Sequence, residues 1–426
     1  MLKKTLVLFL SVAVLLLAAG CPRAADPVPP ANGEELPAAL EIVNWWTAGG
    51  EAEALAALFG VFGEHYPDYS VINSTIAGGA GIGARAVLIA RMVGGRPPDT
   101  FQVHAGQGVI DPYVIPGLME PITFIYEEEG WLEVFPEALL DMLRYDDEFW
   151  TVPVNIHRSN ALWYNRAVFI EHNLTVPATL DEFFTVAETL SNAGVIPLAL
   201  GETWTVAHLF ESVLLGTLGP DAYIGLWNGT TAWDGPEVTS AIANFNRMLD
   251  YVNEDFSALS WDEAARLVVD GEAAMYVMGD WAHGYFMAQE WTPGVEYGWA
   301  PSPGTAGSFM ALSDSFGLPL GAPNRDVAVA WLRTVGSPAG QDAFNPIKGS
   351  IPARTDADRT LYDVYLISAM DDFARDAIVP SFMHGAAAAP AWMDGIIEAV
   401  AVFAGDRNEQ AFQSSLVAAA EDALAN

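Results

Sequence analysis

The chain has 426 residues, of which 52% are hydrophobic and 17% charged, enough apolar material for roughly two domains of about 100–200 residues each. It carries 54 acidic against 18 basic side chains, and its formal net charge of −36 repels phosphate backbones and anionic lipid headgroups. Composition therefore argues against nucleic-acid binding and against electrostatic binding to a membrane surface, and the single cysteine excludes an internal disulfide.

The first twenty residues have the pattern of an export signal. Lys3 and Lys4 precede an apolar run, Thr5–Leu17, and the small residues Ala18–Gly20 follow it. The run is shorter than the roughly 20 residues that a membrane-spanning helix needs. We therefore expect residues 1–20 to be a signal peptide and the protein to be exported.

Cys21 follows the small residues directly, and this segment resembles a bacterial lipobox. The pattern predicts that Cys21 is acylated and anchors the protein to the outer face of the membrane, in the periplasm or at the cell surface. Cleavage by an ordinary signal peptidase near Ala25 is the alternative. Residues 21–37 hold five prolines and are expected to form an extended tether.

From residue 40 onward, short apolar runs alternate with segments of helical spacing. The first runs, Leu40–Trp46, Tyr69–Ile76 and Thr100–His104, are predicted strands, and Ala52–Tyr66 and Ala84–Val93 are the helices between them. This alternation predicts parallel βαβ units and an α/β fold.

Further along, helical segments dominate. We expect helices over Leu180–Ala193, Ala207–Leu218, Pro236–Val252, Trp261–Gly271, Arg325–Gly336, Trp392–Phe403 and Gln410–Ala425. We expect strands over Glu148–Pro153, Asn160–Tyr164, Ala274–Met278, Tyr297–Pro301 and Ser313–Leu320.

The glycine-rich segment Gly79–Ala84 loosely matches a dinucleotide-binding fingerprint between a strand and a helix. The acidic residue that should end the next strand is missing, since Asp99 precedes that strand. The segment is therefore interpreted as a flexible turn into a helix. The seven histidines show no metal-ligand spacing, so neither a metal nor a cofactor is expected.

Short clusters that mix aromatic and hydrogen-bonding side chains are the main functional signal. They contain Trp45, Trp46 and Glu51; Gln102 and His104; Asn155 and His157; Asp280 and Trp281; Ser313–Ser315; Asn345–Lys348; and His384. Sugars present apolar C–H faces and a rim of hydroxyl groups, so a sugar site needs aromatic platforms and charged hydrogen-bonding partners. No catalytic motif accompanies these clusters, which favours carbohydrate binding, although paired carboxylates leave a glycosidase open.

Several long motifs carry a resemblance to a known family. They are Asp99–Gly106, Val152–Asn160, Val277–Trp281, Trp299–Thr305, Leu312–Pro319 and Phe344–Ser350. Over nearly the whole chain from Leu40, the sequence resembles the extracellular solute-binding proteins (family 1) of bacterial ABC sugar importers. Within that family it is similar to a member from a thermophilic bacterium that binds glucose, galactose and mannose.

The resemblance implies a two-lobed periplasmic-binding-protein fold with discontinuous lobes and a hinge. Lobe one would comprise residues 38–152 and 299–345, and lobe two 153–298 and 346–426. The implied function is high-affinity binding of a monosaccharide of the glucose, galactose or mannose type. Hinge closure would then deliver the sugar to an ABC permease with cytoplasmic ATPases. The resemblance also implies that the protein is a monomer without enzymatic activity. The alternatives are a secreted glycoside hydrolase or lectin, or a disaccharide-specific receptor.

Carried over position by position, the resemblance implies a set of sugar contacts. They are Trp45, Trp46, Glu51, Gln102, His104, Trp261, Trp281, Asp314, Lys348 and His384. Asn155 and His157 are the next candidates, because they lie between the expected lobes.

Lys348 is the only lysine that remains after signal removal, which also takes the net charge from −36 to −38. Two interpretations of this acidic, lysine-poor composition stay open: adaptation to a salty habitat, and an ordinary acidic exported protein.

Overall fold

The computed structural model describes residues 39–47, 49–77 and 79–425. The predicted signal peptide, Cys21 and the proline-rich tether lie outside these residues.

The first sheet has five strands in the order β2-β1-β3-β13-β6. Their bounds are β1 Ala39–Asn44, β2 Ser70–Thr75, β3 Thr100–His104, β6 Thr151–Pro153 and β13 Asp314–Gly317. β1 runs parallel to β2 and β3, as predicted, with α1 (Gly49–His65) and α2 (Ile82–Val93) as the connecting helices. β13 enters from far along the chain and lies antiparallel to β3, which places Asp314 opposite His104.

Two smaller sheets follow. One has the strand order β11-β8-β10-β9 and the other β14-β12-β7. Their bounds are β7 His157–Arg158, β8 Ala161–Asn165, β9 Ile196–Ala199, β10 Ala273–Val277, β11 Tyr297–Pro301, β12 Ser308–Leu312 and β14 Ala377–Pro380, and a short hairpin pairs β4 Arg144–Tyr145 with β5 Glu148–Phe149.

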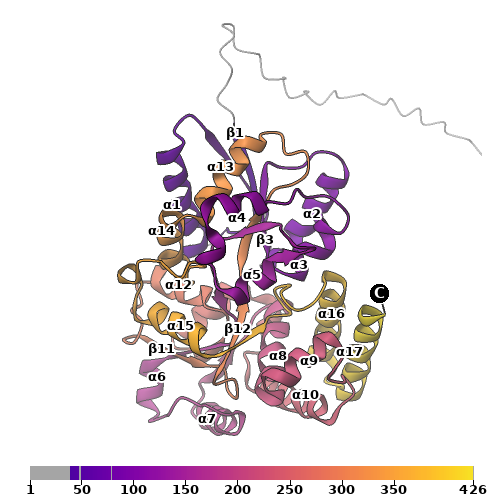
Figure 1. Ribbon diagram of the computed structural model, residues 1–426. Coiled ribbons are helices and arrows are strands. Elements are labelled where there is room, and N and C mark those ends of the chain that lie inside the picture. Colours follow the sequence, from indigo (N-terminus) through magenta and orange to yellow (C-terminus); the bar gives the residue numbers. More distant parts are fainter. Residues whose placement is uncertain (1–38, 48, 78, 426) are drawn as a thin grey trace, which may run out of the picture. The chain divides into compact units, whose positions relative to one another are not determined.

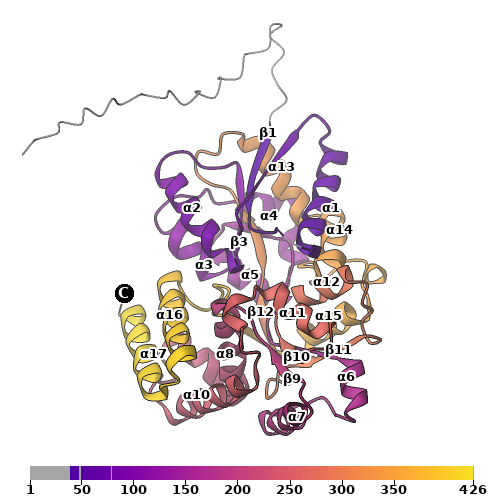
Figure 2. The ribbon, with the colours of Figure 1, turned by 180° about the vertical axis from the view of Figure 1, so that it is seen from behind.

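Helices cover the sheets on both sides. In Figures 1 and 2, α1 and α14 lie side by side on one flank of the first sheet, while α2 and α3 lie on the other. The remaining bounds are α3 Gln107–Val109, α4 Thr123–Glu129, α5 Glu137–Leu143, α6 Arg166–Glu171, α7 Leu180–Asn192, α8 Thr203–Leu218, α9 Pro220–Asn228, α10 Pro236–Met248, α11 Trp261–Val269, α12 Trp281–Ala288, α13 Arg325–Gly336, α14 Pro338–Lys348, α15 Val364–Arg375, α16 Pro390–Asp406 and α17 Glu409–Leu424.

Local sequence explains where several of these helices begin. α7 and α11 both begin with a capping box, in which Thr179 pairs with Glu182 and Ser260 with Glu263. Residues on nearly every side of α8 are buried, because it lies in a helical layer with α10 and α16. The predicted helices are confirmed to within a few residues. Several further elements were not predicted, among them α9, α12, α14, α15, β9, β12 and β14.

Three short segments join the first sheet to the rest of the fold. Residues 154–156 link β6 to β7, Ser313 links β12 to β13, and residues 349–351 follow α14. Ile156 and Ile351 exchange backbone hydrogen bonds of 2.8 and 3.1 Å, and Ser313 Oγ donates to the Asn155 carbonyl at 2.7 Å. The crossings therefore lie side by side, the arrangement of a hinge between two α/β lobes. The residue boundaries of the lobes stay a prediction.

Candidate functional site

A cavity of about 220 Å³ lies where strand ends and helix starts meet. Trp45 and Trp46 follow β1 and His104 ends β3, which matches the rule that ligands bind at the carboxyl ends of parallel strands. Nine of the ten predicted ligand residues line the cavity: Trp45, Trp46, Glu51, His104, Trp261, Trp281, Asp314, Lys348 and His384. Their role in binding stays a prediction, but the structure brings them together from distant parts of the chain.

Gln102, the tenth predicted residue, lies behind the cavity wall and has both ends of its amide engaged. Its Nε2 donates to Asp314 Oδ1 at 3.0 Å, and its Oε1 accepts from the Trp45 backbone N–H at 3.1 Å. Asn155 acts in the same way from the crossing segment, since its Nδ2 donates to Asp314 Oδ2 at 2.9 Å. Both amides therefore hold the carboxylate of Asp314 from behind, while His157 lines the cavity itself.

Asp314 is the most strongly held carboxylate of the cavity. Burial by itself would raise its pKa, but His157, Lys348 and His104 outweigh burial and hold the pKa well below its usual range. His157 Nε2 lies 3.3 Å and His104 Nε2 3.6 Å from its oxygens. Burial lowers the pKa of His104 to about 4 against the attraction of Asp314, so His104 is neutral. Asp314 is thus an ionised hydrogen-bond acceptor.

Lys348 reaches the cavity from the carboxyl end of α14, where a cation also stabilises the helix dipole. Its side chain is 2% exposed, and its Nζ donates to Glu51 Oε1 at 2.8 Å. The Nζ also lies 5.7 Å from the ring centroid of Trp46 and 5.9 Å from that of Trp281, within the range of cation–π contacts.

A glycine contact fixes where α14 ends. Gly349 has φ +85°, and a Cβ there would lie 2.5 Å from the backbone nitrogen of Gly284 in α12. Only glycine allows this conformation and this approach together. The contact packs the end of α14 against α12, which brings Lys348 beside Trp281.

Indole rings form the apolar walls. Trp204, in the first turn of α8, lies 6.3 Å from Trp281 between ring centroids, and Trp45 packs edge-on against His104 at 5.1 Å. The glycine-rich loop closes against these rings: a Cβ on Gly79 would lie 2.2 Å from Trp204 Nε1, and one on Gly81 2.9 Å from Trp45. The loop is a turn into α2, as predicted, and its glycines make room for two indoles.

Behind His384 lies a fully buried polar group. Ser381 Oγ lies 2.9 Å from His384 Nδ1 and donates to both oxygens of Glu211, at 3.0 and 2.9 Å. Within the described part of the chain, His208, Glu211 and His384 lie close enough together to hold a cation. Ser159 Oγ and the Met383 N–H also donate to Glu211, at 2.5 and 3.2 Å, so hydrogen bonds already satisfy its carboxylate.

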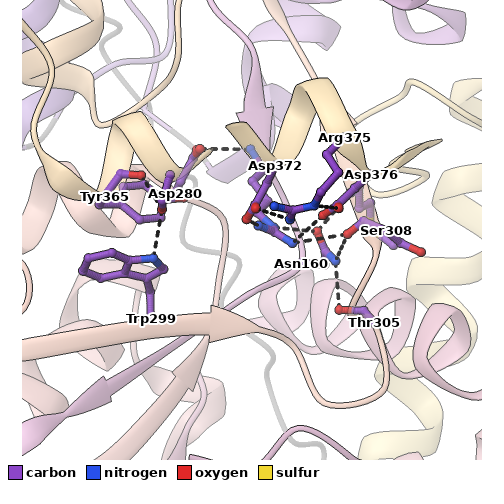
Figure 3. Close-up of polar contacts among 12 residues, drawn as sticks. Asn160, Asp280, Trp299, Thr305, Ser308, Tyr365, Asp372, Arg375 and Asp376 are labelled. Atoms are coloured by element: carbon purple, nitrogen blue, oxygen red, sulfur yellow. Dashed lines mark hydrogen bonds and ion pairs between the residues drawn. The ribbon is translucent and has the colours of Figure 1, made fainter. Parts of the chain in front are cut away.

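A second polar group supports the cavity from the side of β7. Asp280, which directly precedes Trp281, accepts hydrogen bonds from His157 Nδ1 and from the Arg158 backbone N–H. Burial would lower the pKa of His157, but Asp280 outweighs it and the pKa is raised. Figure 3 shows Asp280 and, beside it, the polar group that runs through Asp372 to Asn160. Arg158, which is 3% exposed, connects Asp280 to this group: its backbone N–H donates to Asp280, and its guanidinium donates to Asp372 at 2.6 Å.

Some lining residues were not predicted from the sequence. Glu202 and Trp204 follow the carboxyl end of β9, and Glu202 accepts from the Trp204 indole N–H at 2.9 Å. Ser260 and Asp262 flank the predicted Trp261, and the Ser260 hydroxyl donates to Asp262 at 2.6 Å. Ligands bind beyond the carboxyl ends of strands, which is where Glu202 and Trp204 lie, but β9 was not among the strands predicted from the sequence.

Comparison with known proteins shows the family. The family model described as bacterial extracellular solute-binding protein matches residues 46–342. An uncharacterized ABC transporter extracellular-binding protein of Pyrococcus horikoshii is 39% identical over 360 residues, covering 83% of this chain and 81% of the relative. The chain belongs to the family of bacterial extracellular solute-binding proteins.

Solved structures show the same two-lobed fold. A bacterial solute receptor, AcbH, described as having an exclusive preference for β-D-galactopyranose, aligns with a TM-score of 0.80 and 18% identity over 91% of this chain and 98% of its own. A chitin oligosaccharide binding protein aligns with a TM-score of 0.80 and 20% identity over 91% and 99%. Among the described residues, no helix is both long and apolar enough to cross a membrane.

Proposed function

We propose that this protein binds one monosaccharide of the glucose, galactose or mannose type in the described cavity and delivers it to an ABC import permease. The observation that carries the proposal is the cavity itself, in which indole walls surround an ionised carboxylate, a lysine and the neutral His104 and His384. Indole faces suit the C–H faces of a sugar, and the charged groups make strong hydrogen bonds with its hydroxyls.

The charges of the cavity favour a neutral ligand that is rich in hydroxyl groups. Four carboxylates line the cavity, those of Glu51, Glu202, Asp262 and Asp314. The lysine of the cavity, Lys348, is already paired with Glu51. An anionic ligand such as a sugar phosphate would meet uncompensated negative charge. Hydroxyl groups can donate to these carboxylates and accept from the Lys348 ammonium.

We propose a single sugar ring as the occupant, for which the cavity of about 220 Å³ has room. A disaccharide receptor is the alternative within the same family. Calorimetry with glucose, galactose, mannose and matched disaccharides separates the two. One hexose should bind most tightly at one equivalent, and a disaccharide that binds tighter than every monosaccharide would contradict this choice.

The protein is proposed to perform no chemistry on its ligand. A glycosidase needs a general acid with a raised pKa beside a second carboxylate, whereas the pKa of Asp314 is shifted downward. Incubation with oligosaccharides followed by a reducing-end assay tests this point. Release of new reducing ends by the purified protein, abolished by Asp314→Asn, would favour the secreted glycosidase.

Delivery is proposed to occur through hinge closure about the three crossing segments. Arg85 on α2 makes a double hydrogen bond with Asp394 on α16, at 2.7 and 2.8 Å, and so ties an element beside the first sheet to the carboxyl-terminal helices. Small-angle scattering with and without sugar should show a smaller radius of gyration in the bound protein. A wild-type radius of gyration that does not change on sugar addition would contradict closure. Arg85→Ala, which lacks this tie, should show a smaller decrease than the wild type.

Cys21 is proposed to carry the lipid anchor, and the mature protein to act as a monomer outside the cytoplasmic membrane. Support for the anchor comes from the sequence alone, because Cys21 lies outside the described residues. Sedimentation of the tether-free protein with and without sugar should give the mass of one chain in both cases.

A further inference from the structure

We propose that Glu211 is a positioning residue that, through Ser381, keeps the proton of His384 on Nδ1, so that Nε2 meets the ligand as a hydrogen-bond acceptor. This inference rests on the proposed function, because it assigns a direction to one hydrogen bond of the sugar site. His384 would then select a ligand hydroxyl that donates.

The geometry of the Glu211–Ser381–His384 chain sets the direction of each bond. A serine hydroxyl carries one hydrogen, and an ionised carboxylate can only accept. Ser381 Oγ lies 2.9 and 3.0 Å from the two oxygens of Glu211 and 2.9 Å from His384 Nδ1. Since the one Ser381 hydrogen goes to Glu211, the Ser381 oxygen must accept from an Nδ1–H of His384. His384 lines the cavity, and Nε2 is the ring nitrogen left for a ligand.

The surroundings of Glu211 favour its ionised form at slightly alkaline pH. Ser159 Oγ and the Met383 N–H donate to the same carboxylate, and a carboxylate that accepts several bonds stays ionised more readily. The titratable groups that face it are His208 on α8, His384 itself and Tyr223 on α9. Burial raises the pKa of Glu211 to about 7, so the carboxylate is ionised at about pH 8.

His384 is neutral, which makes the position of its single ring proton decisive. Burial, followed by the nearby His208 and His104, holds its pKa well below the usual range. A neutral imidazole has one donor and one acceptor nitrogen, and the partner of one nitrogen determines the role of the other. Here Ser381 accepts the hydrogen bond from Nδ1, so Nε2 is the acceptor nitrogen.

The test measures the tautomer directly by nitrogen NMR of protein labelled with ¹⁵N-histidine, at about pH 8, with and without the best-binding hexose. His384 should carry its proton on Nδ1 in both states. Ser381→Ala removes the acceptor, so the proton should move toward Nε2, and hexose affinity should fall about 2- to 12-fold, the worth of one neutral hydrogen bond. Ser159→Ala is the matched control, because it removes a bond to Glu211 but not the one to His384.

The outcomes distinguish a failure of the Glu211–Ser381–His384 hydrogen-bond chain, here called the relay, from a failure of the proposed sugar site. An Nε2–H tautomer in the wild-type protein, or an unchanged tautomer in folded Ser381→Ala, would overturn the relay. Stoichiometric Zn²⁺ binding that removes the Nδ1 proton would also overturn it, in favour of a cation held by His208, Glu211 and His384. If no sugar binds while the ligand-free protein shows the expected tautomers, the relay stands and the proposed function fails.

Discussion

Replacing Lys348 with alanine tests the sugar site at its single buried lysine. The ammonium is 2% exposed, donates to Glu51 Oε1 at 2.8 Å and has two further hydrogens for a ligand. Lys348→Ala therefore removes a charged hydrogen bond to the sugar, worth roughly 1.5–3 kcal/mol. At about 1.4 kcal/mol per tenfold change, affinity should fall about 10- to 150-fold.

The same change has a second cost, which is to stability. Removing Lys348 leaves Glu51 without its partner in a largely buried place, and an unpaired buried polar group costs roughly 1–3 kcal/mol. The melting temperature should therefore fall by several degrees, while the protein stays folded at room temperature. Lys348→Arg should also weaken binding, because the larger planar group must displace the sugar or Glu51.

Titration calorimetry on folded variants with the best-binding hexose measures the affinity. Arg354→Ala is the matched control, because Arg354 is also a largely buried cation paired with a carboxylate, Asp356, at 2.8 Å, and lies outside the cavity. It should lose stability but bind within about twofold of the wild type. A folded Lys348→Ala protein that binds within twofold of the wild type would refute the assignment.

Three further predictions concern the anchor, the charge and a buried acid. Cys21→Ser should release the protein from membranes, and a wild-type protein that fractionates as fully soluble would contradict the anchor. With a net charge of −36, the melting temperature should rise from 0.1 to 1 M chloride, because the Debye length falls from about 10 to about 3 Å; a flat or falling value counts against salt adaptation. Burial raises the pKa of Glu211 from 4.5 to about 7, so the folded protein binds this proton more tightly than the unfolded chain, and stability falls as pH rises through this window. Glu211→Gln should therefore reduce the difference in the free energy of unfolding between about pH 5 and pH 8 by about 2–3 kcal/mol. Urea unfolding at these two pH values measures it, and an unchanged difference would place the pKa of Glu211 outside this window.

The first three strands could be predicted because β1 and β2 are each followed by a helix of clear spacing. The segment Ser308–Gly317 could not, because ten almost wholly buried residues give no alternation that separates two strands. The chain divides there, with β12 in one sheet and β13 in another, and Ser313 is the crossing residue. α14 was missed for another reason: it contains Pro346, which is unusual within a helix.

The residues of the site divide in the same way. Trp45 and His104 could be found from the residues alone, since they stand at the ends of predicted strands. Glu51 and Lys348 also belonged to the clusters of aromatic and hydrogen-bonding residues, but nothing in their spacing indicates that they meet. Trp204 was missed because α8 is apolar on nearly every side, so an indole facing a cavity looks like one that faces the core.

The polar groups of the cavity are already oriented by partners inside the protein. Gln102 and Asn155 hold Asp314, Glu51 holds Lys348, and Ser381 holds His384. Each holding residue stands on a different element from the residue that it orients, apart from Ser381, so the arrangement forms only when the whole fold has formed. Because these side chains are ordered before a ligand arrives, binding loses less conformational entropy than it would at a site of mobile side chains. A rigid set of directed hydrogen-bonding groups is what distinguishing sugars by single hydroxyl positions requires, since a misplaced hydroxyl leaves a buried group unpaired.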